Sequence, residues 1–177
     1  MEHGEVLQEV HVDRNLSLYT SAMKKQNRQD IQRRVAVRRS PVHGRGVFAL
    51  RALKAGERIF EYKGERIAWT AAIRRHGSTG TDGHTYFFGL SDGRVIDGGQ
   101  GGNSARWLNH ACTANCEAVE IEDRVFIHAS TAIAPGEELF LDYQLAVDDP
   151  NDEETRLSYV CRCGASKCRG TMLAVGS

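Results

Sequence analysis

The segment Arg106-Trp-Leu-Asn-His-Ala-Cys-Thr-Ala-Asn-Cys116 is the most informative part of this 177-residue chain. It is followed by Gly136-Glu-Glu-Leu-Phe-Leu-Asp-Tyr143 and preceded by Ser40-Pro-Val-His-Gly-Arg-Gly-Val-Phe-Ala49. A fourth motif, Cys161-Arg-Cys-Gly-Ala-Ser-Lys-Cys168, lies near the C-terminus. The four motifs span the chain from about residue 35 to residue 173, and fold and function are inferred from them.

Composition is that of an ordinary single soluble domain, with 41% hydrophobic and 26% charged residues. The 23 Lys and Arg residues balance 23 Asp and Glu residues, so no global field attracts nucleic acid or a membrane. Locally, residues 24 to 39 are basic and residues 148 to 154 are acidic. Each run is either a solvated surface or a binding surface. The basic run also resembles a split nuclear-import signal, but it has no interleaved aromatic residues, which argues against direct nucleic-acid binding.

Cysteine usage and hydropathy predict an intracellular protein. None of the five cysteines lies in the first hundred residues, and three are packed into eight residues, a pattern typical of metal ligands rather than of disulfides. No apolar run approaches the ~20 residues of a membrane span, and the N-terminus lacks a signal-peptide pattern.

The pattern of apolar and turn residues predicts a mainly β domain with few short helices. Residues 1–34 form an N-terminal arm or extension, residues 35–145 the main domain, and residues 146–177 an acidic linker with a cysteine-rich tail. Short strands are expected at residues 35–37, 46–50 and 59–62, a helix at 65–76, and hairpins at 84–96 and 117–128.

The four motifs, in this order, resemble those of the SET-domain protein lysine methyltransferases with a C-terminal post-SET tail. The resemblance implies several small sheets and a knot-like crossing, in which the Asn109-His110 segment passes beneath the segment that carries Tyr143. It also implies a zinc-binding knuckle at the C-terminus.

The knuckle motif supplies three thiolates, from Cys161, Cys163 and Cys168. A closed structural zinc site takes four ligands, so one more must come from elsewhere, and Cys112 and Cys116 are available. The family resemblance implies that Cys112 completes the site. Cys116 is then expected to be a small buried residue of the core.

The family's methyl donor is S-adenosylmethionine, and the resemblance implies which residues bind it. The loop of His43, Gly44 and Arg45 matches the first cofactor loop, where a glycine lets the backbone approach a ligand closely. Asn109 and His110 match the residues that hold the donor. Arg106 is expected to brace this segment from within. Met172 and Leu173 fall where the family often places a residue against the adenine.

Tyr143 matches the family's catalytic tyrosine, and Tyr86 matches a tyrosine that lines the lysine channel. Phe88 and Tyr62 are further candidates, either for the channel or for the core. Leu141 occupies a position where the family usually carries Phe or Tyr. Because leucine is smaller than an aromatic ring and has no hydroxyl, we expect a pocket that admits di- or trimethylation.

The function expected from this resemblance is methylation of a lysine in a basic protein, most of all a histone H3-type tail. Two alternatives remain: a non-histone basic substrate, or an inactive SET domain that binds peptides. The acidic residues 148–154 would attract a basic tail. We expect a monomer, located in the nucleus if the owner is a eukaryote or delivers the enzyme into one, and in the cytoplasm if it acts within a bacterium.

Overall fold

The computed structural model describes residues 6–7, 34–79, 86–147 and 149–174. Most of the expected N-terminal arm, the basic residues 24–33 and the loop at residues 80–85 therefore lie outside the described residues. The described part is mainly β, as the sequence predicts. Its strands are β1 (Val6–Leu7), β2 (Val35–Arg39), β3 (Arg45–Ala49), β4 (Arg58–Tyr62), β5 (Glu65–Ala68), β6 (Phe87–Gly89), β7 (Arg94–Asp97), β8 (Asn109–His110), β9 (Cys116–Ile121), β10 (Arg124–Ala129), β11 (Glu138–Leu141) and β12 (Ala146–Val147).

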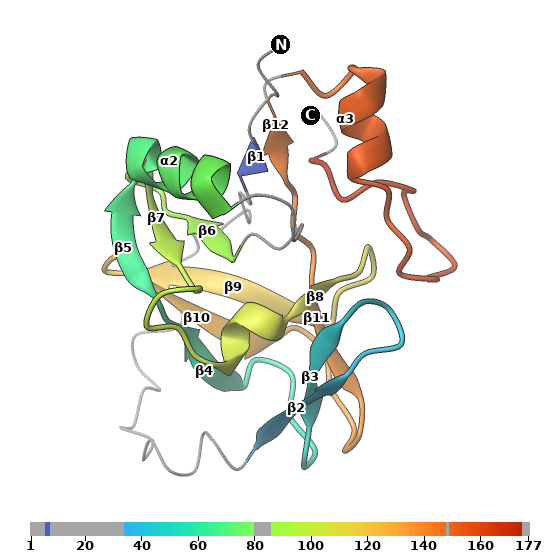
Figure 1. Cartoon of the computed structure of the whole chain (residues 1–177). Coiled ribbons are helices and arrows are strands. Elements are labelled where there is room, and N and C mark those ends of the chain that lie inside the picture. Colours follow the sequence, from blue (N-terminus) through green and yellow to red (C-terminus); the bar gives the residue numbers. More distant parts are fainter. Residues whose placement is uncertain (1–5, 8–33, 80–85, 148, 175–177) are drawn as a thin grey trace.

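The strands form several small sheets, which confirms the predicted fold class (Figure 1). One sheet has the order β2-β3-β11-β8, a second β4-β10-β9 and a third β5-β7-β6, while β1 pairs with β12. Apolar side chains from the first two sheets and from the β6–β7 hairpin meet in one core, with Phe88, Ile127 and Leu139 fully buried. Burial of this core is the main force that holds the small sheets together.

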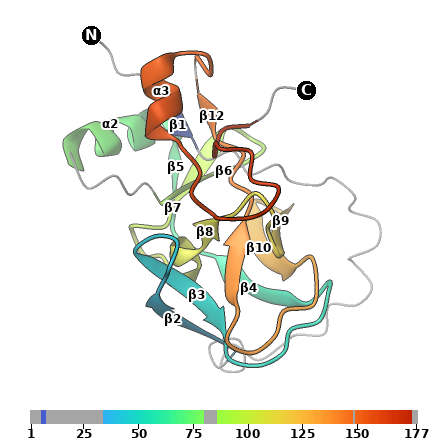
Figure 2. The same ribbon diagram turned by 90° about the vertical axis from the view of Figure 1, so that its right-hand side faces the viewer.

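The two segments that the family resemblance places at the crossing pair with each other as strands β8 and β11. These two strands run parallel, with Asn109 opposite Phe140 and His110 opposite Leu141. The Ala111 N–H donates to the carbonyl of Leu141 at 3.0 Å, which extends the pairing by one residue. The Asn-His segment is thereby held against the strand that leads into Tyr143 (Figure 2).

The predicted hairpins are present because their turns have the required chemistry. Strands β9 and β10 pair along their whole length, and the two turn residues between them, Glu122 and Asp123, have φ angles of 49° and 58°. Two consecutive residues with positive φ are typical of a type I′ turn, whose twist matches that of the two strands. Strands β6 and β7 form the other expected hairpin.

The helix predicted over residues 65–76 is wrong in its first turn. Residues Glu65–Ala68 form strand β5, which pairs with β7 and buries Ile67, while helix α2 spans Trp69–Thr79 and includes Gly77. The pairing partner overrides the helix-favouring composition, since strand formation depends on tertiary contacts.

Two further helical segments were not predicted. The 3-10 helix η1 spans Ser104–Trp107, and α3 spans Glu153–Ser158 inside the expected acidic linker. Asp152 begins α3, because its carboxylate accepts from the Thr155 N–H at 2.7 Å. Acidic residues in the first turn of a helix also interact favourably with its dipole. Among the described residues, no helix has the length and apolar character needed to cross a membrane.

Candidate active site

A cavity of about 590 Å³ collects residues from all four sequence motifs. Its walls come from the β2–β3 loop, from η1 and β8, from the end of β11, and from α3 with the C-terminal tail. The candidate residues on these walls are His43, Gly44, Arg45, Tyr62, Tyr86, Arg106, Asn109, His110, Leu141, Tyr143, Cys161, Cys163 and Met172.

Asn109, on the cavity wall, contacts both the β2–β3 loop and β11. Its amide nitrogen lies 3.1 Å from the carbonyl of His43, 2.8 Å from that of Arg45, and 2.8 Å from a carboxylate oxygen of Glu138. Glu138 is buried and also accepts from the hydroxyl of Ser40 at 2.9 Å. A buried carboxylate is tolerated where it is hydrogen-bonded in this way, so Glu138 fixes both the loop and the amide.

Gly46 makes room for this network. A Cβ atom at position 46 would lie 2.0 Å from Oε1 of Glu138 and 3.2 Å from Cβ of Ser40. The substitution Gly46→Ala is therefore expected to displace the carboxylate and to lower the free energy of unfolding by about 1–3 kcal/mol, as overpacking of a core does. Denaturant unfolding of the two proteins measures the loss.

The matched control is a double variant in which the displaced side chain is one methylene shorter. Glu138→Asp in the Gly46→Ala background frees space, so the double variant should recover part of the lost stability. An unchanged free energy of unfolding in Gly46→Ala would show that the carboxylate does not need its present place.

His110 connects the segment that carries Tyr143 with the cysteine cluster. Its Nδ1 accepts from the backbone N–H of Tyr143 at 3.1 Å, and its Nε2 lies 3.4 Å from Sγ of Cys112. Burial lowers the pKa of His110 below its ordinary value, which favours the neutral ring. With Nδ1 accepting, the proton resides on Nε2 and points at the sulfur of Cys112.

Tyr143 is held by its hydroxyl as well as by its backbone. The hydroxyl donates to the carbonyl of Leu108 at 2.5 Å, and the ring packs against His110 with 5.3 Å between centroids. Burial raises the pKa of Tyr143, so the phenol keeps its proton at neutral pH. The hydroxyl is thus a fixed dipole rather than a base.

Aromatic residues line the cavity next to Tyr143. Tyr86 packs edge-on against Trp107 at 5.2 Å between ring centroids, and the guanidinium of Arg45 lies 5.2 Å from the Trp107 ring. The hydroxyl of Tyr62, also on the cavity wall, donates to the carbonyl of Tyr86 at 2.9 Å. Arg106 lies over the rings of both Tyr86 and Trp107, a position that fits the bracing role expected from the sequence.

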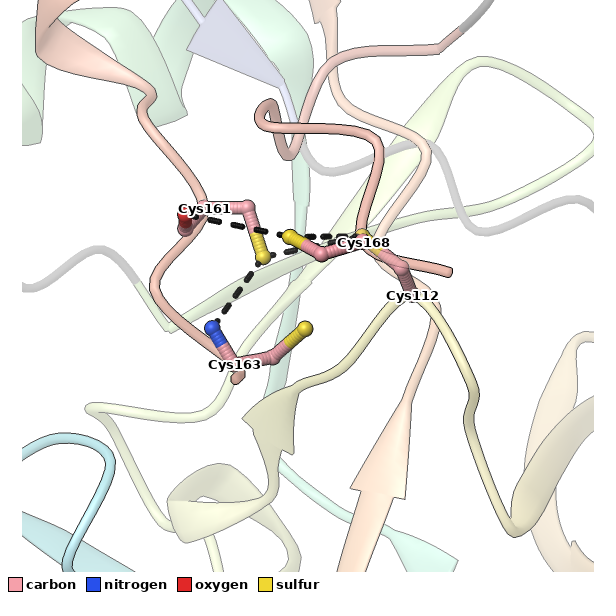
Figure 3. Close-up of side chains that lie close together, drawn as sticks. All are labelled: Cys112, Cys161, Cys163 and Cys168. Carbon is pink, nitrogen blue, oxygen red and sulfur yellow. Dashed lines mark hydrogen bonds between the residues drawn. The ribbon is translucent and has the colours of Figure 1, made fainter. Parts of the chain in front are cut away.

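Four cysteines converge at the rim of the cavity (Figure 3). The Sγ atoms of Cys112, Cys161, Cys163 and Cys168 all lie within 4.8 Å of one another. The sulfur of Cys112 is 3.6 Å from that of Cys161 and 3.9 Å from that of Cys168. A tetrahedral zinc site with Zn–S bonds of about 2.3 Å requires sulfur separations of about 3.8 Å, so the four side chains fit a zinc ion.

The remaining cysteine, Cys116, does not join this cluster. It is buried in the core, and burial raises the pKa of its thiol to about 12. Of the two cysteines that the sequence left available as a fourth ligand, the structure therefore brings only Cys112 to the other three. Cys116 is a small core residue, as expected.

Two candidate residues do not reach the cavity. Phe88 is fully buried in the core, where it packs against Tyr62 with 5.2 Å between ring centroids, so we do not retain it as a channel residue. Leu173 is buried beside Leu145, with which it forms an isolated bridge, whereas its neighbour Met172 is on the wall. Alternation of side chains along an extended segment explains why adjacent residues face different ways.

The sequence analysis missed other parts of the wall. Leu157, Tyr159 and Val160 of α3 and the segment after it line the cavity, and Leu157 is largely exposed there. It also missed the ion pair of Asp142 with Arg169, which joins the segment after β11 to the tail. The position of Asp142 beside Tyr143 indicates that its side chain lies near the site. Nothing in the sequence, however, identifies the distant Arg169 as its partner.

Comparison with known proteins agrees with this geometry. The chain is 36% identical over 74% of its length to the "Histone-lysine N-methyltransferase, H3 lysine-4 specific" of Mycosarcoma maydis, and 36% identical over 76% of its length to human "Histone-lysine N-methyltransferase 2B". It spans only 9% and 5% of these relatives. The crystal structure of the Chaetomium thermophilum polycomb repressive complex 2 matches 66% of the chain, and 16% of that structure's chain, with a TM-score of 0.58 and 31% identity.

A similar structure is a polycomb repressive complex 2 "in an autoinhibited conformation bound to S-adenosylmethionine", with a TM-score of 0.55 and 30% identity. The match covers 61% of the present chain and 15% of the chain in the similar structure. The family model of the SET domain matches residues 44–144, which contain three of the four motifs wholly or in part. The chain therefore belongs to the SET domain family.

Proposed function

We propose that this chain is an S-adenosylmethionine-dependent protein lysine N-methyltransferase. The observation that carries the proposal is the convergence of Tyr143, Tyr86 and the Asn109-His110 segment on one cavity beside a four-cysteine cluster. The relatives named as histone-lysine methyltransferases, and a similar structure described as bound to S-adenosylmethionine, support the same activity and cofactor.

The residues on the wall fit the cofactor. Gly44, on the cavity wall, has a φ of 47°, which glycine adopts readily, and Arg45 offers a guanidinium for the carboxylate of the donor's amino-acid end. The aromatic and apolar residues Trp107, Leu157 and Met172 are suited to the adenosyl group. When bound, S-adenosylmethionine supplies an electrophilic methyl group.

The tyrosines would act by alignment. A lysine arrives protonated at neutral pH, and an apolar channel next to a positive sulfonium lowers its pKa, so that it loses a proton to solvent. The donor would supply the methyl group to this neutral amine, with S-adenosylhomocysteine as the leaving group. The fixed hydroxyl of Tyr143, with the ring of Tyr86, would hold the amine in line, a contribution worth several kcal/mol of barrier.

The substrate we propose is a histone H3-type tail. The relatives "H3 lysine-4 specific" support this assignment. The acidic residues Asp149, Asp152, Glu153 and Glu154 lie at the start of α3, whose later residues reach the cavity wall. Negative charge there would steer a basic tail toward the site. A histone substrate places the protein in a nucleus, and the monomeric state remains a prediction.

The test is transfer of labelled methyl groups to purified core histones and to a lysate of basic proteins. Label on histone H3 would support the full proposal, and label only on other proteins would retain the chemistry but exclude the histone assignment. If no protein is labelled and S-adenosylhomocysteine does not bind either, the enzyme assignment fails and an inactive SET domain that binds peptides takes its place.

Leu141 is expected to set the number of methyl groups. Its side chain is 1% exposed and lies on the wall two residues before Tyr143, where an aromatic residue would occupy more space. Mass spectrometry of a good peptide substrate at long times should show di- and trimethyl products, and Leu141→Tyr should shift the products toward monomethyl. A wild-type reaction that stops at the monomethyl product would contradict this prediction.

A further inference from the structure

An ion pair between Asp142 and Arg169 joins the segment that carries Tyr143 to the cysteine knuckle. Asp142 immediately precedes Tyr143, and Arg169 immediately follows Cys168. Nη1 of Arg169 lies 2.7 Å from Oδ2 of Asp142, and Nη2 lies 2.5 Å from Oδ1. Two parallel hydrogen bonds of this kind fix the relative orientation of both groups as well as their distance.

The pair is half-buried, with side-chain exposures of 25% for Arg169 and 27% for Asp142. Burial pushes the pKa of Asp142 upward, but hydrogen bonds from Arg169 and from Gln144 outweigh it and hold the pKa below its ordinary value. The carboxylate therefore stays charged at neutral pH. A bidentate, partly desolvated pair is better ordered than a surface ion pair.

Asp142 also supports the bend that follows Tyr143. Gln144 has a φ of 49°, a left-handed conformation that a residue with a side chain rarely adopts. Its amide donates to Oδ2 of Asp142 at 2.6 Å, which stabilises the bend. Tyr143 thus lies between Asp142 and Gln144, and the hydrogen bond between these two side chains restrains the backbone on both sides of it.

A second link runs from the knuckle to the same tyrosine. The backbone N–H of Arg169 lies 3.4 Å from Sγ of Cys112, whose sulfur faces His110, and His110 accepts from the backbone N–H of Tyr143. Tyr143 is therefore connected to the cysteine cluster through the His110 ring on one side and through the Asp142–Arg169 pair on the other. The first link depends on a ligand cysteine, whereas the second can be removed without touching a ligand.

We propose that Arg169 is a positioning residue, which acts through Asp142 to transmit the order of the cysteine knuckle to Tyr143. Only the expected effect on kinetics rests on the proposed function, because it requires that the chain transfers methyl groups. The structural consequence, an ordered segment 142–145, holds whether or not the chain transfers methyl groups.

The test compares Arg169→Met and Asp142→Asn with Lys167→Met in the zinc-loaded protein. Lys167 is exposed and lies in the same knuckle, outside the cavity wall. Its replacement by Met removes one positive charge, as Arg169→Met does. Hydrogen–deuterium exchange of residues 142–145 should be faster by about tenfold or more in the two pair variants, which corresponds to about 1.4 kcal/mol of local opening. It should be unchanged in Lys167→Met, and all three proteins should retain one zinc per chain.

Kinetics then separate positioning from general destabilisation. The pair variants should lose kcat while KM for the peptide changes little, Arg169→Lys should recover part of the loss, and the Arg169→Met/Asp142→Asn double variant should be no worse than either single one.

Additive effects, unchanged exchange at residues 142–145, or loss of zinc from Arg169→Met would each overturn the proposal. A wild-type protein that labels no substrate would sink the proposed function instead, and the exchange result would still decide the role of Arg169.

Discussion

Tyr143→Phe is expected to lower the rate of methyl transfer by about 100-fold or more while leaving cofactor binding nearly unchanged. The hydroxyl is held by the Leu108 carbonyl and kept protonated by burial, so in the wild-type protein it presents a dipole of fixed direction. Without this hydroxyl the substrate lysine amine loses a group that aligns it. Small misplacements of reacting groups lower a reaction rate by ~10²-fold. Single-turnover methyl transfer measures the effect.

Two measurements control this experiment. Calorimetric binding of S-adenosylhomocysteine should be within a few-fold of wild type, because Phe retains the ring that packs against His110. The melting temperature should fall only slightly, since one hydrogen bond contributes about 1 kcal/mol. A Tyr143→Phe protein that turns over like wild type would show that the hydroxyl has no part in alignment.

Loss of the metal is expected to have the second largest effect, and Cys112→Ser is the variant that tests it. Cys112 is the one ligand candidate outside the tail among the described residues, so its loss would remove the metal-mediated link between Cys161, Cys163 and Cys168 and the body of the domain. Cys161 and Cys163 also lie on the cavity wall. Cofactor affinity should therefore fall by about tenfold or more, which requires the loss of only about 1.4 kcal/mol of contacts.

Zinc content, cofactor affinity and melting temperature should decrease together in Cys112→Ser. Cys116→Ala is the matched control, because Cys116 lies in the core and leaves the four-cysteine cluster intact. It should lose some stability but retain its zinc and its cofactor. Full zinc occupancy in Cys112→Ser would mean that another group completes the site.

The motifs predicted the site better than they predicted its surroundings. Asn109, His110 and Tyr143 carry a pattern of residue types at fixed spacing, and the structure brings them together. Phe88 and Leu173 had no such constraint, because whether a residue in a short extended segment faces the core or the cavity depends on the exact register. A shift of one residue reverses the direction of the side chain.

The remaining misses have a common physical cause. Strand β5 depends on its partner β7, and the ion pair of Asp142 depends on the return of the tail to the domain. Local propensity contains no information about such distant partners, so composition predicted a helix at Glu65 and could assign no partner to Arg169. Only the tertiary structure shows these contacts.

The strand order β2-β3-β11-β8 also has a consequence for how the chain is made. Strand β11 lies between β3 and β8, although β3 ends at Ala49 and β11 does not begin until Glu138. During synthesis, one edge of β3 and one edge of β8 therefore remain unpaired until β11 leaves the ribosome. Exposed strand edges are templates for aggregation, and pairings between distant segments form slowly. The nascent chain should accordingly be most prone to aggregation until residues 138–141 have been translated.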